Sequence, residues 1–177
     1  RSGLTSAVAG RKFAFGETTS DPSAPFENPN VDTIVVVTRH DSHADYVCRA
    51  LEAGKHVFVE KPLGPTHEQL DRVALAAGRS SALLMVGFNR RFAPQVQKMH
   101  ELLGQVPAAK AFIMMVNAGA IPPDHWTHDA QAGGGRIIGE GCHFVDLLRF
   151  LCGHTIVSVQ AMQFGRAAAD ATHDDRT

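Results

Sequence analysis

The sequence predicts an α/β fold, in which a parallel sheet is followed by part of an α+β domain with an open sheet. The first observation is the run of four β-branched residues at positions 34–37, typical of a strand buried on both faces of a parallel sheet. The others are the helical spacing of apolar residues over positions 43–55 and the apolar run at positions 56–60. Strand, helix and strand in this order imply a right-handed crossover.

The next helix is predicted from its start signal. Thr66-x-x-Gln69 has the form of a capping box, in which two side chains satisfy free backbone amides at a helix start. This helix should bury its apolar residues, which are Leu70, Val73, Ala74 and Ala77. Residues 4–13 also have the pattern of a helix, so the chain is expected to begin in the middle of a fold.

A change in the sequence pattern after Phe88 places a domain boundary near residues 88–92. Two partial domains are expected, residues 1–90 and residues 91–177. The first should end with a strand over residues 83–88. The second should contain a helix over residues 93–103, a strand over 109–117, a loop over 119–135, a helix over 138–151 and a strand over 156–164.

Composition narrows the classes of partner. Seventeen basic and 18 acidic side chains give a net charge of −1, and the chain has no basic block that would attract nucleic acid or an anionic membrane. Its longest apolar runs are far shorter than the roughly 20 residues that span a bilayer. The cysteines, Cys48, Cys142 and Cys152, form no Cys-x-x-Cys pair. We therefore expect free thiols in or near the core of a cytoplasmic protein.

Glu60-Lys61-Pro62 is the strongest sign of chemistry in the chain. It follows the apolar run at positions 57–59, at the carboxyl end of a predicted parallel strand, where open α/β sheets bind their ligands. His143, on a later predicted helix, could face Lys61 across a cleft. The pair favours proton and hydride chemistry on a small polar molecule. The alternatives are a surface salt bridge for Lys61 and a purely structural role for His143.

Several motifs in a fixed order carry a resemblance to a known family. They are Val-Asp-Thr-Ile-Val-Val-Val-Thr at residues 31–38, Ala-Leu-Glu-Ala-Gly-Lys-His-Val at 50–57, Glu-Lys-Pro-Leu at 60–63, Gly-Phe-Asn-Arg-Arg-Phe at 87–92, and Gly-Gly-Gly at 133–135 before His143 and Asp146. Together they resemble the glucose-fructose oxidoreductase, inositol dehydrogenase and rhizopine-catabolism family, Gfo/Idh/MocA. The resemblance implies a partial Rossmann-like dinucleotide-binding domain and a partial substrate and oligomerisation domain. It also implies that both ends of a protein about twice as long are missing.

The resemblance implies a use for the residues at the strand ends. The family's members are NAD- or NADP-dependent oxidoreductases that act on sugars, polyols and related substrates, and Lys61 would be the catalytic lysine. The implied cofactor-binding residues are Thr38, His40, His43, Glu60, Lys61, Asn89 and Arg90. A plain turn at residues 38–43 and a solvated charge at Arg90 are the alternatives. Pro62 is expected to follow a cis peptide bond.

His143 would bind or deprotonate the substrate hydroxyl in this resemblance. The family often has an aspartate four residues before this histidine, where the chain has Gly139. Glu140 could compensate only if its helix starts in a different register; otherwise it could serve as a helix cap. The implied substrate-binding residues are Trp126, His125, Glu140 and Asp146, with an ordered surface loop as the alternative for residues 124–129.

A metal site is the less favoured interpretation of the same residues. Glu140-x-x-His143 matches a carboxylate and histidine ligand pair, but such sites need a second helix with a similar pair, and we expect no metal. Gly139 to Phe144 also resembles family members that are fused behind a zinc-type alcohol dehydrogenase module.

The cofactor site is incomplete in this sequence. Gly3 and Gly10 are isolated, so the chain has no Gly-x-Gly-x-x-Gly turn to hold a pyrophosphate, and we expect it to bind a dinucleotide poorly. The competing interpretation is a non-catalytic binding or assembly module that has lost its cofactor site. In both interpretations the expected partners exclude nucleic acid and membranes. Self-association into a homo-oligomer through the second sheet is expected, because open sheet edges pair readily.

Overall fold

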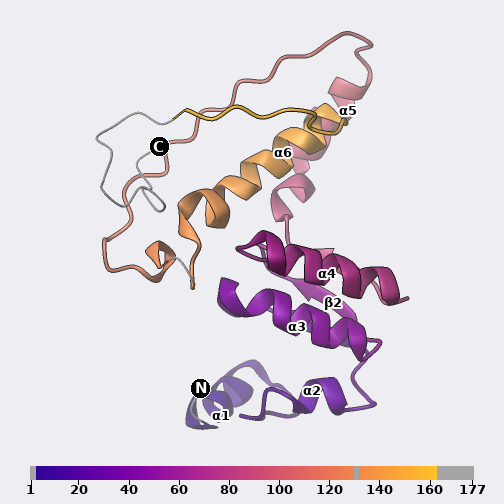
Figure 1. Cartoon of the computed structure of the whole chain (residues 1–177), viewed down its shortest axis with the longest axis vertical. Helices are drawn as coiled ribbons and strands as arrows, with labels where there is room; N and C mark the ends of the chain where they lie inside the picture. Colours follow the sequence, from indigo (N-terminus) through magenta and orange to yellow (C-terminus); the bar gives the residue numbers. More distant parts are fainter. Residues whose placement is uncertain (1–2, 130–131, 163–177) are drawn as a thin grey trace.

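A parallel sheet organises the first half of the chain. The computed structural model describes residues 3–129 and 132–162 (Figure 1). Within these residues the sheet has the order β1-β2-β3, with strands β1 (Thr33–Val36), β2 (His56–Val59) and β3 (Leu84–Val86). The predicted α/β class and the parallel sheet are therefore confirmed.

The strand register brings the ends of the strands together. Val36 pairs with Val59, and Val59 pairs with Val86, so the three strands end at one edge of the sheet. Because the strands are parallel, the residues that follow each of them meet at this edge. Lys61, two residues after β2, lies there.

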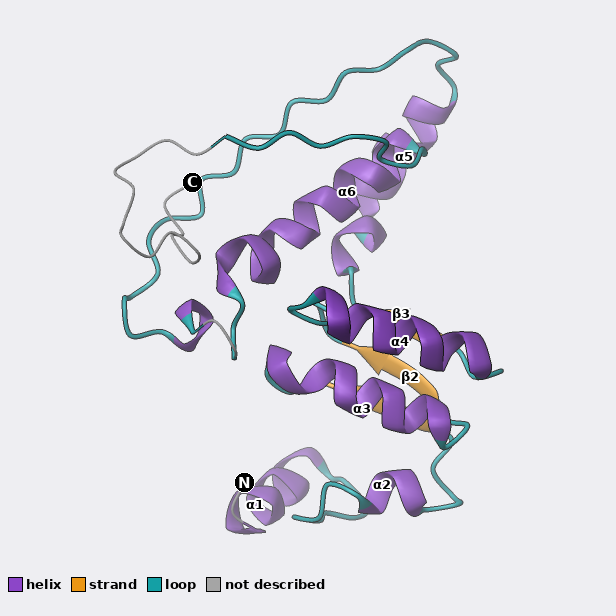
Figure 2. Cartoon of the chain, in the orientation of Figure 1, coloured by secondary structure: helices purple, strands orange, loops and turns teal. Residues whose placement is uncertain are grey.

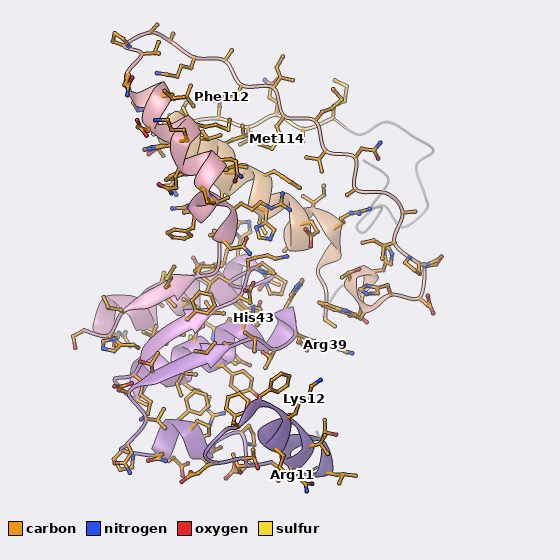
Figure 3. All side chains as sticks on the ribbon, turned by 180° about the vertical axis from the view of Figure 1, so that it is seen from behind. Arg11, Lys12, Arg39, His43, Phe112 and Met114 are labelled. Atoms are coloured by element: carbon orange, nitrogen blue, oxygen red, sulfur yellow. The ribbon has the colours of Figure 1, made fainter. Side chains whose placement is uncertain are left out.

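Two helices cover one face of this sheet. They are α3 (His40–Glu52) and α4 (His67–Arg79), and Figure 3, seen from behind, shows the strands in front of them. The core between helices and sheet consists of Ile34, Val36, Ala44, Val47, Cys48, Ala50, Leu51, Val57, Val59 and Val73. On the other face Val35 is 60% exposed and Val37 64% exposed, so the prediction of a strand buried on both faces is wrong. The cause is that both helices lie on the same side.

Helices α3 and α4 differ in detail from the sequence prediction. α3 begins at His40, three residues earlier than expected, because Arg39 is already extended and serves as its N-cap. α4 begins where predicted, since the Thr66 side chain accepts a hydrogen bond from the amide of Gln69, but Oε1 of Gln69 has no partner among the described residues, so only half of the capping box forms. Its buried face is narrower than predicted: Val73 is buried, whereas Leu70 is 36% exposed and Ala74 is exposed.

The segment before β1 is held by a buried cation in the turn between α3 and β2. α1 (Gly3–Phe13) and α2 (Ala24–Glu27) come first in the chain. Lys55, only 6% exposed, donates hydrogen bonds from Nζ to the carbonyl oxygens of Asn28, at 2.8 Å, and Val31. The cost of burying its charge is offset because carbonyl oxygens replace water around the ammonium.

The second half of the described chain consists of helices joined by long loops (Figure 2). A 3₁₀ turn, η1 (Asn89–Phe92), leads into α5 (Pro94–Gly104). After a second 3₁₀ turn, η2 (Trp126–His128), the chain forms a π-helical turn, η3 (Ile137–Gly141), which continues as α6 (Cys142–Cys152). α5 packs on α6, with the ring of His100 stacked on that of Phe150 at 4.4 Å. No helix of the described residues has the length and apolarity needed to cross a membrane.

The strands predicted at residues 109–117 and 156–164 are not formed in the described part of the chain, and residues 163 and 164 lie outside it. The alternation that predicted the first of them is nevertheless present. Phe112 and Met114 lie on the side of α5 and α6 (Figure 3), whereas Ile113 is 96% and Met115 is 93% exposed. Alternating side chains favour an extended chain, but a strand needs a hydrogen-bonded neighbour, and these segments have none within the described residues.

The three cysteines are free, as predicted, but do not share one environment. Cys48 is buried in the core and Cys142 is partly buried. Cys152, at the end of α6, is exposed, so the prediction that all three lie in or near the core is wrong for this residue. The pKa values of Cys48 and Cys142 are raised by burial, which disfavours the thiolate.

Candidate active site

Lys61 is the centre of the polar cluster at the carboxyl edge of the sheet. The amide of Glu60 donates to the carbonyl oxygen of Val36 at 2.9 Å, which extends the pairing of β1 and β2 by one residue. The Lys61–Pro62 peptide bond is cis, as predicted. The Lys61 side chain is 15% exposed, and its Nζ donates to the carbonyl oxygen of Gly139 at 2.7 Å and to Oε1 of Glu140 at 3.2 Å. The sequence-predicted lysine therefore meets the later helix directly.

The turn that presents Gly139 and Glu140 is π-helical. In a π-turn the backbone hydrogen bonds span one more residue than in an α-helix, which changes the register of the side chains. Glu140 takes part in the ion pair with Lys61 and remains 47% exposed. The sequence left open whether Glu140 could replace the carboxylate that is missing at Gly139, which would require a different helix register. The π-turn provides a different register, and the Glu140 carboxylate reaches Lys61.

His40 occupies the space beside Gly139. A Cβ atom added at residue 139 would lie 3.2 Å from Cε1 of His40, closer than ordinary van der Waals contact. His40 is buried, and its Nδ1 lies 2.9 Å from the carbonyl oxygen of Gly133. Because a carbonyl only accepts, Nδ1 carries the proton and Nε2 is the acceptor of the neutral ring. Burial lowers the pKa of His40, with smaller contributions from His43 and Lys61, although the hydrogen bond to Gly133 opposes the shift.

His143 lies on the first turn of α6 and is 7% exposed. Its ring meets the edge of the Phe88 ring at 6.4 Å. The pKa of His143 is lowered, first by burial and then by the positive charges of Lys61 and Arg90, so its neutral form is favoured. Its Nδ1 is buried without a hydrogen-bond partner among the described residues. This fits the absence of a side chain at Gly139, one turn earlier.

Two of the predicted cofactor-binding residues, His43 and Thr38, already make hydrogen bonds within the protein. His43 is 1% exposed, with Nδ1 2.7 Å from the carbonyl oxygen of Pro62 and Nε2 3.0 Å from that of Thr38. The Thr38 hydroxyl lies 2.6 Å from that of Ser42. The geometry gives His43 a structural role, in which it holds the turn after β1 against the residue that follows Lys61.

The other predicted residues lie around the cluster. Glu60 accepts a hydrogen bond from the amide of Lys61 at 3.3 Å through its own carboxylate, and Asn89 is exposed at the start of η1. The guanidinium of Arg90 lies 4.4 Å from the centre of the Phe144 ring. Arg90, Phe144 and Glu140 are among the residues that line a cavity of about 320 Å³. This cavity adjoins the Lys61 ion pair, whereas another of about 530 Å³, on the surface of α3 and α4, contains no candidate residue.

The predicted substrate-binding residues lie in different surroundings. Trp126 packs its ring against His40 at 4.8 Å, so the loop of residues 124–129 does reach the cluster. His125 is exposed and its Nδ1 lies 2.9 Å from the hydroxyl of Thr127. Asp146 is 9% exposed and accepts hydrogen bonds from two nitrogens of Arg91, one of them at 3.1 Å. Its carboxylate joins α6 to η1 and is already engaged.

Sequence reasoning missed two backbone acceptors. The carbonyl oxygens of Gly133 and Gly139 orient His40 and Lys61, and side-chain patterns do not reveal such roles. The signal that could have indicated them was Gly139 itself, a glycine where the resemblance expected an aspartate. Across the described ranges, no three His, Cys, Asp or Glu side chains gather in the manner of a metal site.

A three-stranded parallel sheet with helices on one face, and with a lysine at the carboxyl end of a strand, is a Rossmann-like α/β arrangement. Residues 5–88 match a family described as "Oxidoreductase family, NAD-binding Rossmann fold", and residues 100–177 match the "GFO/IDH/MocA C-terminal domain". The chain belongs to the Gfo/Idh/MocA family.

Individual relatives agree with this assignment. The chain is 29% identical over 143 residues to the myo-inositol 2-dehydrogenase of Thermotoga maritima, which covers 80% of the chain and 42% of that protein. It is 34% identical over 146 residues to inositol 2-dehydrogenase 2 of Saccharopolyspora erythraea, which covers 80% of the chain and 41% of the relative. A solved levoglucosan dehydrogenase in complex with NADH and levoglucosan superposes with a TM-score of 0.77 at 26% identity, over 86% of this chain and 43% of that one. The chain thus spans less than half the length of these relatives.

Proposed function

We propose that the whole protein is an NAD- or NADP-dependent oxidoreductase that oxidises a carbinol group of a sugar, polyol or related substrate. The observation that carries this proposal is the Lys61 ammonium at the carboxyl edge of the sheet, fixed by Gly139 and Glu140 beside a histidine with an unpartnered Nδ1. The names of the inositol and levoglucosan dehydrogenases that the chain resembles support the substrate class.

The residues present fit the nicotinamide end of a dinucleotide. Thr38 and Glu60 follow neighbouring strands at the edge where open sheets bind such ligands, and the buried Nδ1 of His143 has no partner in the described chain. When bound, the dinucleotide would supply the acceptor for the hydride that leaves the carbinol carbon. The assignment of Asn89 and Arg90 to the cofactor side and of Trp126 and His125 to the substrate side is part of this proposal.

Lys61 and His143 divide the work on the hydroxyl group. Lys61 has three N–H donors, two of which are directed at Gly139 and Glu140, and the third would donate to the substrate oxygen. This donor stabilises the negative charge that develops as the O–H proton moves to the neutral imidazole of His143. The C–H bond then breaks with its electron pair leaving as hydride, and the carbonyl of the product forms.

The experiment uses the full-length protein with a panel of inositols and sugars and with NAD⁺ or NADP⁺, followed by absorbance of the reduced nicotinamide. Lys61→Met should lower kcat/KM by about 100-fold or more, because general acid–base groups contribute about that much. Lys98→Met is the matched control, since Lys98 forms an exposed ion pair with Glu101 on α5. Absence of turnover across the panel, or an active Lys61→Met variant, would contradict the proposal.

A non-catalytic binding module is the second candidate. Gly139, at a position where the resemblance expected an aspartate, favours it. Fluorescence of NADH and NADPH separates the two candidates, because a full-length protein that changes neither signal has no cofactor site. The retained ion pair of Lys61 supports the enzyme instead.

Self-association and location belong to the same proposal. The homo-oligomer predicted from the sequence is part of the proposal, and Ile113 and Val157, which are 96% and 95% exposed, are apolar side chains that an interface would cover. Light scattering of the full-length protein tests this, and a monomer at all concentrations would contradict it. Free cysteines support a cytoplasmic location. Fusion to a zinc-type alcohol dehydrogenase module stays a prediction from residues 139–144.

A further inference from the structure

We propose that Glu140 is a positioning residue for Lys61, and that it supplies the carboxylate for which residue 139 has no side chain. The inference rests on the proposed function, because it assigns the group that orients the catalytic ammonium. It differs from the sequence-based expectation that Glu140 contacts substrate.

The proposal rests first on the hydrogen bonds of Lys61. Nζ donates to the carbonyl oxygen of Gly139 at 2.7 Å and to Oε1 of Glu140 at 3.2 Å. An ammonium group has three donors, so two are directed by η3 and the third direction is fixed by tetrahedral geometry. A single acceptor would leave the group free to rotate, whereas two acceptors hold it in one orientation.

The proposal rests secondly on the geometry of the π-helical turn η3. Residue 139 cannot provide the acceptor through a side chain, because it is glycine and a Cβ there would lie 3.2 Å from His40. η3 presents the carbonyl of Gly139 and the side chain of Glu140, the next residue, to the same ammonium. π-turns are rare and occur frequently at functional sites.

The environment distinguishes this ion pair from an ordinary surface pair. Lys61 is 15% exposed, so its ammonium has few water molecules available as alternative acceptors. In the exposed pair of α5, Lys98 and Glu101 are 60% and 55% exposed, and water can replace either partner. Loss of the Glu140 carboxylate therefore changes the orientation of Lys61, whereas loss of the Glu101 carboxylate has little effect.

The test compares Glu140→Ala, Glu140→Gln and Glu140→Asp with the control Glu101→Gln in the full-length protein. Glu101 is a suitable control because its exposure, 55%, is close to the 47% of Glu140. We expect kcat to fall about tenfold or more in Glu140→Ala with a smaller change in KM, since misplacement of a catalytic group by about 1 Å can cost 100-fold. Glu140→Gln keeps an oxygen acceptor and should be less affected, and Glu140→Asp should recover part of kcat.

A second measurement does not depend on turnover. NMR of isotope-labelled lysine side chains detects an ammonium that exchanges slowly with water, and Lys61→Arg identifies the signal of Lys61. This signal should be present in the wild type and in Glu101→Gln and be broadened in Glu140→Ala. If the wild type oxidises a substrate while Glu140→Ala keeps kcat within twofold and an unchanged signal, this inference is overturned and the proposed function stands. If the wild type turns over no substrate, the proposed function fails, and the NMR result alone decides whether Glu140 holds Lys61.

Discussion

Nδ1 of His43 lies 2.7 Å from the carbonyl oxygen of Pro62, and this contact links α3 to the residue that follows Lys61. The other ring nitrogen lies 3.0 Å from the carbonyl oxygen of Thr38, in the turn after β1. Figure 3 shows His43 close to Arg39, at the amino end of α3. One buried side chain therefore joins the two strand ends that frame the candidate site.

The first prediction concerns this link. His43→Ala should lower the free energy of unfolding by about 1–3 kcal/mol, because it removes a buried ring that contacts the buried carbonyl oxygen of Pro62. Urea denaturation of the full-length protein measures the change. His67→Ala, at an exposed position on α4, is the control and should stay within about 0.5 kcal/mol of the wild type. Equal effects of the two substitutions would show that the buried contacts contribute nothing.

The second prediction tests the contact between His40 and Gly139. Alanine favours helices over glycine by up to about 1 kcal/mol, but a Cβ at residue 139 would lie 3.2 Å from the His40 ring. That ring is held by Gly133 and Trp126, so Gly139→Ala should fail to stabilise the wild type and should stabilise a His40→Ala background. The four unfolding free energies form a double-mutant cycle with an expected coupling of about 1 kcal/mol. Additive effects would mean that the ring moves aside without cost.

The third prediction separates the two apolar positions of α4. Val73 is 2% exposed and Leu70 is 36% exposed, although both belonged to the apolar face predicted from sequence. Val73→Ala should cost about 1–3 kcal/mol, because it removes buried methyl groups from the core. Leu70→Ala should cost less although it removes a larger group. Denaturation midpoints with an unchanged m-value provide the measurement, and a larger loss for Leu70→Ala would place the core elsewhere.

The fourth prediction follows from the lowered pKa of His143. Burial, Lys61 and Arg90 depress its pKa in the folded state below the ordinary value of 6.5. As pH falls below about 6.5, the unfolded chain therefore binds a proton that the folded protein still excludes, and the free energy of unfolding decreases. The loss continues until pH passes below the depressed pKa.

Thermal unfolding of the wild type and of His143→Gln between neutral and mildly acidic pH measures this linkage. The wild type should lose stability more steeply than the variant, because glutamine takes up no proton. His40 has a pKa lowered in the same direction, so the residual slope of His143→Gln should decrease further in a His40→Gln, His143→Gln double variant. Parallel curves for all three proteins would contradict the shifts.

Much of the first half could be predicted from sequence. β-branched runs, helical spacing and the Thr66 cap depend on local backbone preferences and on burial of one helix face, and these signals placed β1, α3, β2 and α4 within a few residues. The division into domains at residues 90 and 91 stays a prediction. In the second half, residues 109–117 carry the alternation of a strand without forming one, because strand formation depends on a partner that local sequence does not specify.

The sequence by itself determined the order of β1, α3, β2 and α4, the parallel sheet and the position of Lys61 at a strand end, since each depends largely on neighbours in the chain. Only the tertiary structure decided which groups meet there. Gly139 and Glu140 reach Lys61 from 78 and 79 residues away through a π-turn, and His40 rather than a side chain at residue 139 fills the adjoining space. Such contacts depend on helix register and on close packing between distant segments, and no periodicity in the sequence encodes them.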